Sequence, residues 1–305
     1  MLKTHDVQKN IDIFDKLIKI FPDKIYNVLG NLPENVKSNA LEIRVRVQRN
    51  IIIILNNDYI NIDLMISPED IDTIFKKICN YCIYSFQNQI KNGYITFENG
   101  HRIGLAGSAV LENNHVTNIK NISSMNIRIA REFKNCSKEI FGIIKKNING
   151  TLIVGAPMTG KTTILRDLAR LFSVEYNQKV VIIDEKYEIA STYNGIPQFD
   201  IGLADVLSGF PKNHGTIMAL RTLSPDIIIC DEIGSEQDYN YIKNILNSGV
   251  KIITTVHSCD EMELLNRPQI NYLLKMNIFD TVVFLNSSKK PGEILKIKKA
   301  SELVC

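Results

Sequence analysis

The chain has 305 residues, of which 45% are hydrophobic and 23% are charged, and its formal net charge is +3 at pH 7. This composition is typical of soluble globular proteins, and the length gives room for two domains with separate cores. The small and evenly spread charge gives no argument for nucleic-acid binding, although it is compatible with a local basic patch.

Apolar runs in the sequence are short. The longest, Ile51 to Leu55, is far below the about 18 consecutive apolar residues that a membrane-spanning helix needs. The N-terminal sequence has scattered charges and lacks an apolar segment of signal-peptide length. We therefore expect a cytosolic protein that has no integral membrane segment.

Cysteine usage indicates a reducing compartment. Of the six cysteines, the only close pair is Cys79 and Cys82, which lie in a stretch whose pattern predicts the interior of a helix. Buried thiols are the favoured interpretation of this pair, and a metal or redox site is the alternative.

Residues 1–135 are predicted to form a smaller α+β domain, because helical and alternating apolar patterns both occur there. Ser67 is expected to cap a helix that begins at Pro68, where the missing N–H costs nothing. The dipeptide Asn99-Gly100 indicates a tight hairpin. Predicted strands cover 42–47, 51–55, 59–64, 94–97, 102–111 and 126–130, and predicted helix covers 7–29 with an interruption at Pro22.

Residues 136–305 alternate strands with helices, which predicts an α/β domain with a mainly parallel sheet and helices on both faces. A predicted helix over 138–146 leads into this domain, so the boundary lies within 132–150. The lysine-rich stretch 289–299 is predicted as an edge strand protected by its lysines, with a docking surface for a partner or anionic lipid as the alternative. Predicted strands cover 152–154, 180–183, 227–230, 252–256, 282–285 and 293–298. One predicted helix begins at Lys161, and another covers 236–247.

A phosphate-binding loop is the strongest local signal. The pattern Gly155-x-x-x-x-Gly160-Lys161-Thr162 follows an apolar strand and opens a helix, so that backbone N–H groups and the helix N-terminus face a phosphate. Lys161 is expected to reach the β- and γ-phosphates, and the Thr162 hydroxyl to bind Mg²⁺. With ATP and Mg²⁺ as ligands, the predicted binding residues are Gly155, Ala156, Pro157, Met158, Thr159, Gly160, Lys161, Thr162 and Thr163.

Polar residues follow the other strands of this domain, where the carboxyl ends of parallel strands share one edge of the sheet. Asp231 is expected to hold Mg²⁺ through water, and its neighbour Glu232 to polarise an attacking water. His257 ends the next strand and is predicted to sense the γ-phosphate, the alternatives being a core histidine or a helix cap. Together these residues predict hydrolysis of a bound nucleotide.

A third acidic group and several arginines leave more room for interpretation. Asp184, Glu185 and Glu188 could support the metal, supply an alternative base, for which Glu185 is the candidate, or contact a neighbouring subunit. Charge on the γ-phosphate calls for an arginine, and an arginine supplied by a neighbour would require a ring. The arginine candidates are Arg221, which we favour, and Arg267, Arg128 and Arg131.

Several segments carry a resemblance over nearly the whole chain. They include LEIRVRV (41–47), GYITFENGHRIGLAGSAV (93–110), NISSMNIRIARE (121–132), GAPMTGKTTILRDLAR (155–170) and LSPDIIICDEIG (223–234). In these segments the chain resembles the stage III sporulation protein AA family, ATPases related to the motors of type II and type IV secretion and of type IV pili.

The resemblance implies a RecA-like P-loop ATPase domain behind the smaller N-terminal domain, assembled as a hexamer with nucleotide between subunits. It also implies a peripheral position on the mother-cell side of the forespore-engulfing membrane. The implied partners are membrane proteins of the same sporulation set, at the channel that links mother cell and forespore. The expected activity is an ATP-hydrolysing motor for that channel.

Departures from the family pattern keep two other functions in view. Met158 and Ser235 stand where a glycine and a basic residue are usual, and the segment 199–207 lacks an expected arginine. A nucleotide-switched scaffold with little turnover is one alternative, and Met158 supports it. A nucleic-acid-coupled P-loop ATPase is the other, although no basic-aromatic module is visible.

Overall fold

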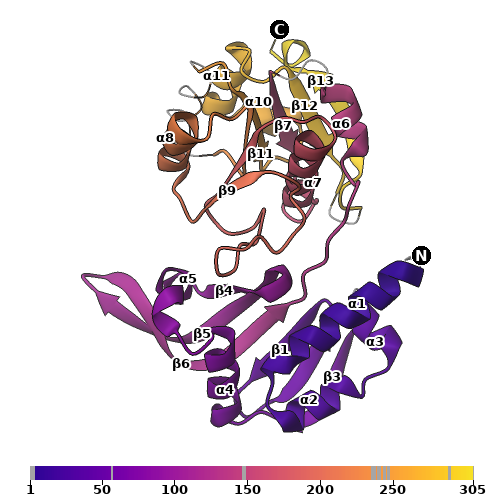
Figure 1. Ribbon diagram of the computed structural model, residues 1–305, viewed down its shortest axis with the longest axis vertical. Coiled ribbons are helices and arrows are strands. Elements are labelled where there is room, and N and C mark those ends of the chain that lie inside the picture. Colours follow the sequence, from indigo (N-terminus) through magenta and orange to yellow (C-terminus); the bar gives the residue numbers. More distant parts are fainter. Residues whose placement is uncertain are drawn as a thin grey trace. The chain divides into compact units, whose positions relative to one another are not determined.

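The computed structural model describes residues 4–55, 58–145, 149–234, 238, 242, 245, 248–287 and 290–304. The chain forms two compact units, Met1–Arg131 and Glu132–Cys305. Within the described residues, the N-terminal unit contains a six-stranded sheet and the C-terminal unit a seven-stranded sheet (Figure 1).

The sheet of the N-terminal unit has the strand order β3-β2-β1-β6-β5-β4, and its neighbouring strands pair antiparallel. Alternate residues of β1 and β2, such as Ile43 and Ile53, are fully buried, which fits a sheet with one face on a core. The elements are α1 (Thr4–Leu17), α2 (Asp23–Gly30), α3 (Glu34–Asn39), β1 (Glu42–Arg46), β2 (Asn50–Ile54), β3 (Tyr59–Met65), α4 (Pro68–Ile78), α5 (Gln87–Lys91), β4 (Tyr94–Phe97), β5 (His101–Glu112) and β6 (His115–Arg128).

Two local predictions in this unit are confirmed. Ser67 caps α4 by accepting a hydrogen bond from the backbone N–H of Asp70 at 3.2 Å. Asn99 and Gly100 turn the chain between β4 and β5 with φ angles of 56° and 77°, which are left-handed values that these residue types tolerate. The first helical stretch is interrupted before Pro22, as predicted, while the predicted turn at 56–57 lies outside the described residues.

The predicted helix across the cysteine pair is wrong. Helix α4 ends at Ile78, and both Asn80 and Tyr81 have positive φ angles, of 46° and 58°. Two successive left-handed residues reverse the chain, so a right-handed helix cannot continue through them. As a result Cys79 is buried and Cys82 is exposed, and only the first fits the buried-thiol interpretation.

The sheet of the C-terminal unit has the order β13-β12-β7-β11-β10-β8-β9. Its neighbouring strands run parallel except for the antiparallel pair β12 and β13, so the sheet is mixed. The elements are α6 (Lys138–Ile144), β7 (Gly150–Val154), α7 (Lys161–Val174), β8 (Val180–Asp184), β9 (Asp205–Ser208), α8 (Lys212–Thr222), β10 (Ile227–Cys230), β11 (Lys251–Val256), α10 (Glu261–Leu265), α11 (Pro268–Lys275), β12 (Thr281–Leu285) and β13 (Ile294–Lys299).

Helices cover both faces of this sheet (Figure 1). Alternate strand residues point to opposite sides, so Ile153 and Ile229 pack in one core with α6 and α7. Leu152 and Ile228 pack in a second core with α8, α10 and α11. Burying each such side chain contributes about 1.5–3 kcal/mol, which explains why the strands are apolar along their whole length.

The lysine-rich stretch forms the edge strand β13, as predicted. Lys298 pairs with Glu261 at 2.9 Å, and Lys296 contacts the same carboxylate. Of the helix predicted over 236–247, residues 238, 242 and 245 are helical, and the other positions lie outside the described residues, as does Ser235.

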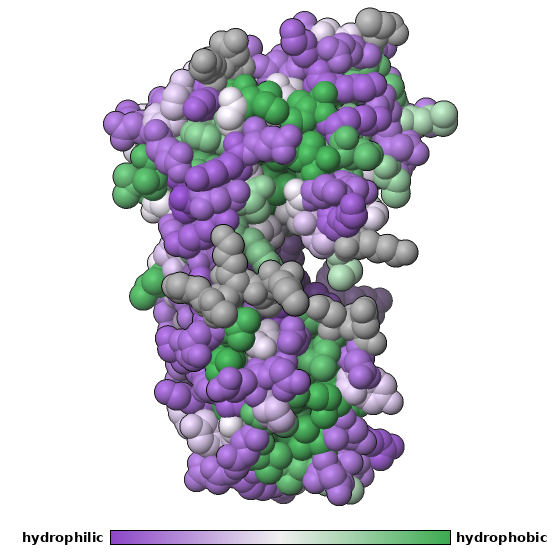
Figure 2. Space-filling model, turned by 90° about the vertical axis from the view of Figure 1, so that its right-hand side faces the viewer, coloured by the Kyte–Doolittle hydropathy of each residue, from purple (hydrophilic) through white to green (hydrophobic). Residues whose placement is uncertain are grey.

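No helix in the described part of the chain has the length and apolar character that crossing a membrane requires. Hydrophobic residues reach the surface of both units among many hydrophilic ones (Figure 2).

Candidate functional site

The loop between β7 and α7 is a tight turn that requires glycine at two places. A Cβ on Gly155 would lie 2.5 Å from the Oγ1 of Thr159, and Gly160 has a φ angle of +90°. The Thr159 hydroxyl donates to the carbonyl of Ala156 at 2.9 Å, and the Gly155 N–H donates to Val256 at the end of β11 at 3.3 Å. The loop is therefore fixed at the carboxyl edge of the sheet.

The backbone N–H groups of this loop suit a phosphate. Among the described residues, no protein acceptor takes a hydrogen bond from the N–H groups of residues 158–163. These groups sit at the N-terminus of α7, where the helix dipole favours an anion. The donor set therefore fits the phosphates of a nucleotide.

Lys161 is folded back over the loop, with 6% of its surface exposed. Its ammonium donates to the carbonyls of Gly155 at 2.7 Å and Ala156 at 2.8 Å, and lies 3.0 Å from Nδ1 of His257. Burial lowers the pKa of Lys161, and the negative charges of Asp231 and Glu232 oppose this effect. Phosphate oxygens could replace the two carbonyl oxygens as acceptors without moving the lysine backbone.

Hydroxyl and carboxylate oxygens meet beside the loop. Thr162 donates through its hydroxyl to Asp231 at 3.0 Å, and Thr255 donates to the other oxygen of the same carboxylate at 2.8 Å. Hard oxygen ligands of this kind, together with water and phosphate, are what Mg²⁺ prefers. The described residues include no cluster of three or more His, Cys, Asp or Glu that could hold a metal ion.

Glu232 faces the same cavity. Its carboxylate lies 3.7 Å from Nε2 of His257 and 3.4 Å from the ammonium of Lys186. His257 therefore connects Lys161 to Glu232 through its two ring nitrogens. The cavity has a volume of about 410 Å³ and is lined by Pro157, Met158, Gly160, Lys161, Thr162, Thr163, Glu188, Asp231, Glu232, His257 and Pro291.

The turn between β12 and β13 also supports the loop. The N–H of Gly292 donates to the carbonyl of Thr159 at 2.8 Å. A Cβ on Gly160 would approach the nitrogen of Gly292 to 3.0 Å, so the two backbones are in close contact. The loop thus depends on a segment far along the chain.

Comparison with known proteins identifies the family. The family described as "Sporulation stage III, protein AA" matches residues 12–303 of the chain. The chain belongs to this family. It is 35% identical over 290 residues to the Stage III sporulation protein AA of Bacillus subtilis (strain 168), an alignment that covers 93% of this chain and 94% of the relative.

Solved structures show that this family member shares its fold with RecA-like secretion and pilus ATPases. The ATPase DotB of Legionella pneumophila aligns with a TM-score of 0.54 and 18% identity, over 80% of this chain and 72% of DotB. The pilus retraction motor PilT, solved with bound ADP, aligns with a TM-score of 0.56 and 13% identity, over 80% of this chain and 74% of PilT.

The structure separates the members of the third acidic group. Asp184 is 1% exposed and accepts hydrogen bonds from the backbone N–H groups of Glu188 and Ala190, at 2.8 and 2.9 Å. Burial raises its pKa, and the charge of Asp231 adds to this effect. Asp184 therefore holds the turn after β8. Glu185 is exposed and lines a neighbouring cavity of about 520 Å³, whose wall also includes Glu232.

The favoured arginine candidate is not brought to the loop. Arg221 is exposed in the last turn of α8 and does not line the cavity beside the loop. Arg267 is closer, since it lines the 520 Å³ cavity and pairs with Glu263 at 3.2 Å.

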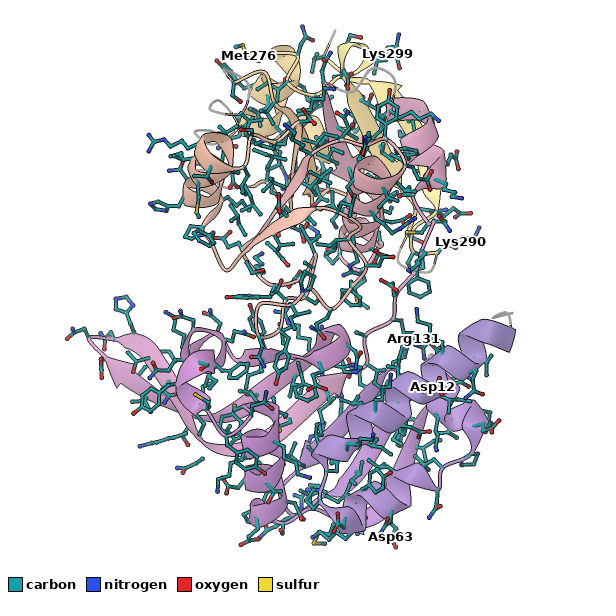
Figure 3. All side chains as sticks on the ribbon, in the orientation of Figure 1. Asp12, Asp63, Arg131, Met276, Lys290 and Lys299 are labelled. Atoms are coloured by element: carbon teal, nitrogen blue, oxygen red, sulfur yellow. The ribbon has the colours of Figure 1, made fainter. Side chains whose placement is uncertain are left out.

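The two N-terminal candidates have partners inside their own unit. Arg131 donates to the carbonyls of Ser38 and Ala40, both at 2.9 Å (Figure 3). Arg128 pairs with Glu42 at 3.4 Å. The Arg128 contact joins the end of β6 to β1, and the Arg131 contacts join the residues after β6 to the segment before β1. These two arginines therefore stabilise the N-terminal unit.

Two cations beside the site, the buried Arg166 and the half-buried Lys212, were missed in the sequence. Arg166 on α7 donates to the carbonyls of Ile189 and Glu188, at 2.6 and 2.9 Å, and its guanidinium lies 3.6 Å from the ring centre of Phe199. Lys212 donates to the carbonyl of Glu232. The sequence offered a signal for Arg166, because it is a basic residue on the amphipathic helix α7. It offered none for Lys212, because the proline before it indicates only where a helix begins.

Proposed function

We propose that this family member is an ATP-hydrolysing motor that energises the assembly of, or transport through, the mother cell–forespore channel during endospore formation. Family membership supports the sporulation role. The fold shared with the ATPase DotB and the pilus retraction motor PilT supports the motor role. ATP and Mg²⁺ are the proposed ligands.

The observation that carries the proposal is the convergence of Thr162, Asp231, Glu232 and His257 on the free N–H groups of the phosphate loop. In the proposed reaction the loop N–H groups and Lys161 bind the phosphates, and the Glu232 carboxylate accepts a proton from the attacking water. Bound Mg²⁺ would offset negative charge on the phosphate oxygens, held there by Thr162 and Asp231.

We further propose a homo-oligomer, hexameric as in the motors of this kind, docked on a membrane protein of the sporulation channel from the mother-cell cytoplasm. Arg221 is exposed and does not line the cavity beside the loop of its own chain. An arginine that completes a neighbour's site would have this kind of position. Arg267 is the alternative, because it lines the cavity next to Glu232.

The decisive experiment measures ATP hydrolysis by the purified chain as a function of its concentration, with Lys161→Ala as the test variant. Loss of the ammonium should abolish nucleotide binding and hydrolysis together. Lys275→Ala, at an exposed position in the last turn of α11, controls for the loss of a surface lysine and should match the parent. A steep rise of the specific rate with concentration supports a shared site.

Two results would contradict the motor. If the parent chain binds ATP at all concentrations yet does not hydrolyse it, the chain is a nucleotide-switched scaffold. If single-stranded nucleic acid stimulates hydrolysis in a salt-sensitive way, the chain is a nucleic-acid-coupled ATPase instead.

A further inference from the structure

The backbone at Glu232 has an unusual conformation. Its φ angle is +23°, in the left-handed region that residues with a side chain seldom adopt. Such a conformation persists where the surrounding contacts determine it, and it is common at functional sites. The question is therefore which groups hold Glu232 in place.

Thr255 holds the first side of this turn. Its hydroxyl oxygen accepts the N–H of Glu232 at 3.1 Å, an N–H that also donates to Oδ1 of Asp231 at 2.9 Å, and its carbonyl accepts the N–H of Ile233 at 2.8 Å. These two bonds connect the turn to β11. They leave the carbonyl of Glu232 to be satisfied from the opposite side.

Lys212 holds that opposite side. Its ammonium donates to the carbonyl of Glu232 and lies 3.5 Å from the carboxylate of Asp238. Asp238 in turn accepts the N–H of Gly234 at 2.8 Å. Lys212 therefore joins the first residue of α8 to both ends of the segment 232–234.

The surroundings of Lys212 argue against a direct contact with nucleotide. Its side chain is 15% exposed, and it lines the 520 Å³ cavity, whose wall includes Glu232 but no residue of the phosphate loop. Lys186, by comparison, is 55% exposed and contacts the carboxylate end of Glu232. Of these two lysines, Lys212 is the one that fixes the backbone.

We propose that Lys212 is a positioning residue, which sets the direction of the Glu232 carboxylate by holding its peptide group between α8 and β11. This inference rests on the proposed ATPase activity. Displacing a catalytic group by about 1 Å can cost on the order of 100-fold in rate. Loss of the Lys212 ammonium should therefore lower kcat and leave the affinity for ATP unchanged.

The test compares Lys212→Met, Lys212→Arg and the surface control Lys275→Met with the parent. We measure kcat, KM and the affinity for a fluorescent ATP analogue, and we follow thermal unfolding of each variant. Lys212→Met should lose about 100-fold in kcat with nucleotide affinity within about 2-fold of the parent. Lys212→Arg, which can still donate to the carbonyl, should recover most of the rate, and Lys275→Met should match the parent.

Other outcomes overturn the inference. A parallel loss of affinity and kcat would mean that Lys212 contacts the nucleotide, and an unchanged kcat would mean that Glu232 needs no such support. If Lys212→Met does not unfold cooperatively, Asp238→Asn replaces it, with a smaller fall in kcat expected and an unchanged kcat again counting against the inference. A parent that binds ATP without hydrolysing it overturns the proposed function itself, and the inference with it.

Discussion

The two units of the protein bury polar groups for different purposes. In the N-terminal unit His101 is fully buried and accepts the N–H of Ala130 at 3.1 Å. Burial lowers its pKa to about 4, so the ring is neutral and can accept this backbone N–H just beyond the end of β6. In the C-terminal unit Lys161 and Asp231 meet around a cavity. The buried histidine of the N-terminal unit therefore supports the fold, whereas Lys161 and Asp231 of the C-terminal unit line a cavity.

The largest expected effect tests the reactive unit. Glu232→Gln keeps the size of the side chain and its backbone contacts, but an amide cannot accept a proton from water. General-base catalysis is worth about 10²–10⁴-fold, so kcat should fall by that factor while ATP binding persists. Single-turnover hydrolysis and equilibrium binding measure the two quantities. Hydrolysis at the parent rate would transfer the base role to Glu185, the exposed carboxylate of the neighbouring cavity.

The next effect tests the structural unit. The folded pKa of His101, about 4, lies below its ordinary value of 6.5, so the unfolded chain binds the proton first as the pH falls. The contribution of the neutral His101 to the free energy of unfolding is complete above pH 6.5. It is lost as the pH falls to 4, for a total of about 3 kcal/mol. Hydrogen exchange of β1 and β6 amides at pH 7 and pH 5, corrected for intrinsic rates, should show about 2 kcal/mol of this loss.

In a His101→Gln variant this pH-dependent loss should disappear, while ATP hydrolysis at pH 7 should match the parent. An equal loss in parent and variant would show that another group causes the acid sensitivity. A change in hydrolysis would show that the two units are not separate in function.

A smaller effect tests the support of the Asp231 carboxylate. Thr255→Val keeps the shape of the side chain but removes the hydroxyl that donates to Asp231, while the N–H of Glu232 keeps its second acceptor, Oδ1 of Asp231. Loss of such a supporting group costs about 10–100-fold in metal affinity or activity, so hydrolysis should need more Mg²⁺. Magnesium titration of the rate measures this. Thr254→Val, on the same strand but in contact with Cys230, is the matched control and should need no additional Mg²⁺.

The smallest expected effect concerns the phosphate loop itself. Met158 is 85% exposed and has a φ angle of 65°, a conformation that costs a residue with a side chain about 1 kcal/mol. Met158→Gly removes this cost from the free and the nucleotide-bound protein alike, so ATP affinity should stay within about 2-fold of the parent while the free energy of unfolding rises by about 1 kcal/mol. Isothermal titration measures the affinity and thermal unfolding the stability, and a clearly weaker affinity would show that the methionine itself contacts the nucleotide.

Much of the fold could be predicted from the sequence, because apolar runs and glycine spacing act locally. The strand and the helix that flank the phosphate loop, the lysine-rich edge strand and the Asn99-Gly100 hairpin were all predicted and are present. Helices α8, α10 and α11 and strand β9 were not predicted. Helix α8 lacks a clear apolar stripe, since Gly215 and Thr216 are buried where larger apolar residues are expected.

The candidate site was predictable only where one motif carries the chemistry. The loop, Asp231 and His257 stand at strand ends, which the sequence pattern marks. Lys212 and Asp184 act through the backbone of other segments, and no spacing rule connects a side chain to a carbonyl or N–H brought near by folding. The left-handed turn after Cys79 was missed for another reason, since neither Asn80 nor Tyr81 is a glycine.

The contact between Gly292 and Thr159 has a consequence for biosynthesis. A ribosome completes the phosphate loop long before it reaches the hairpin that holds the loop in shape. Domains generally fold as units, and the hydrogen bond from Gly292 can form only after the turn between β12 and β13 has been synthesised. A chain that ends before Gly292 therefore lacks this support of the loop, even though every residue of the loop itself is present.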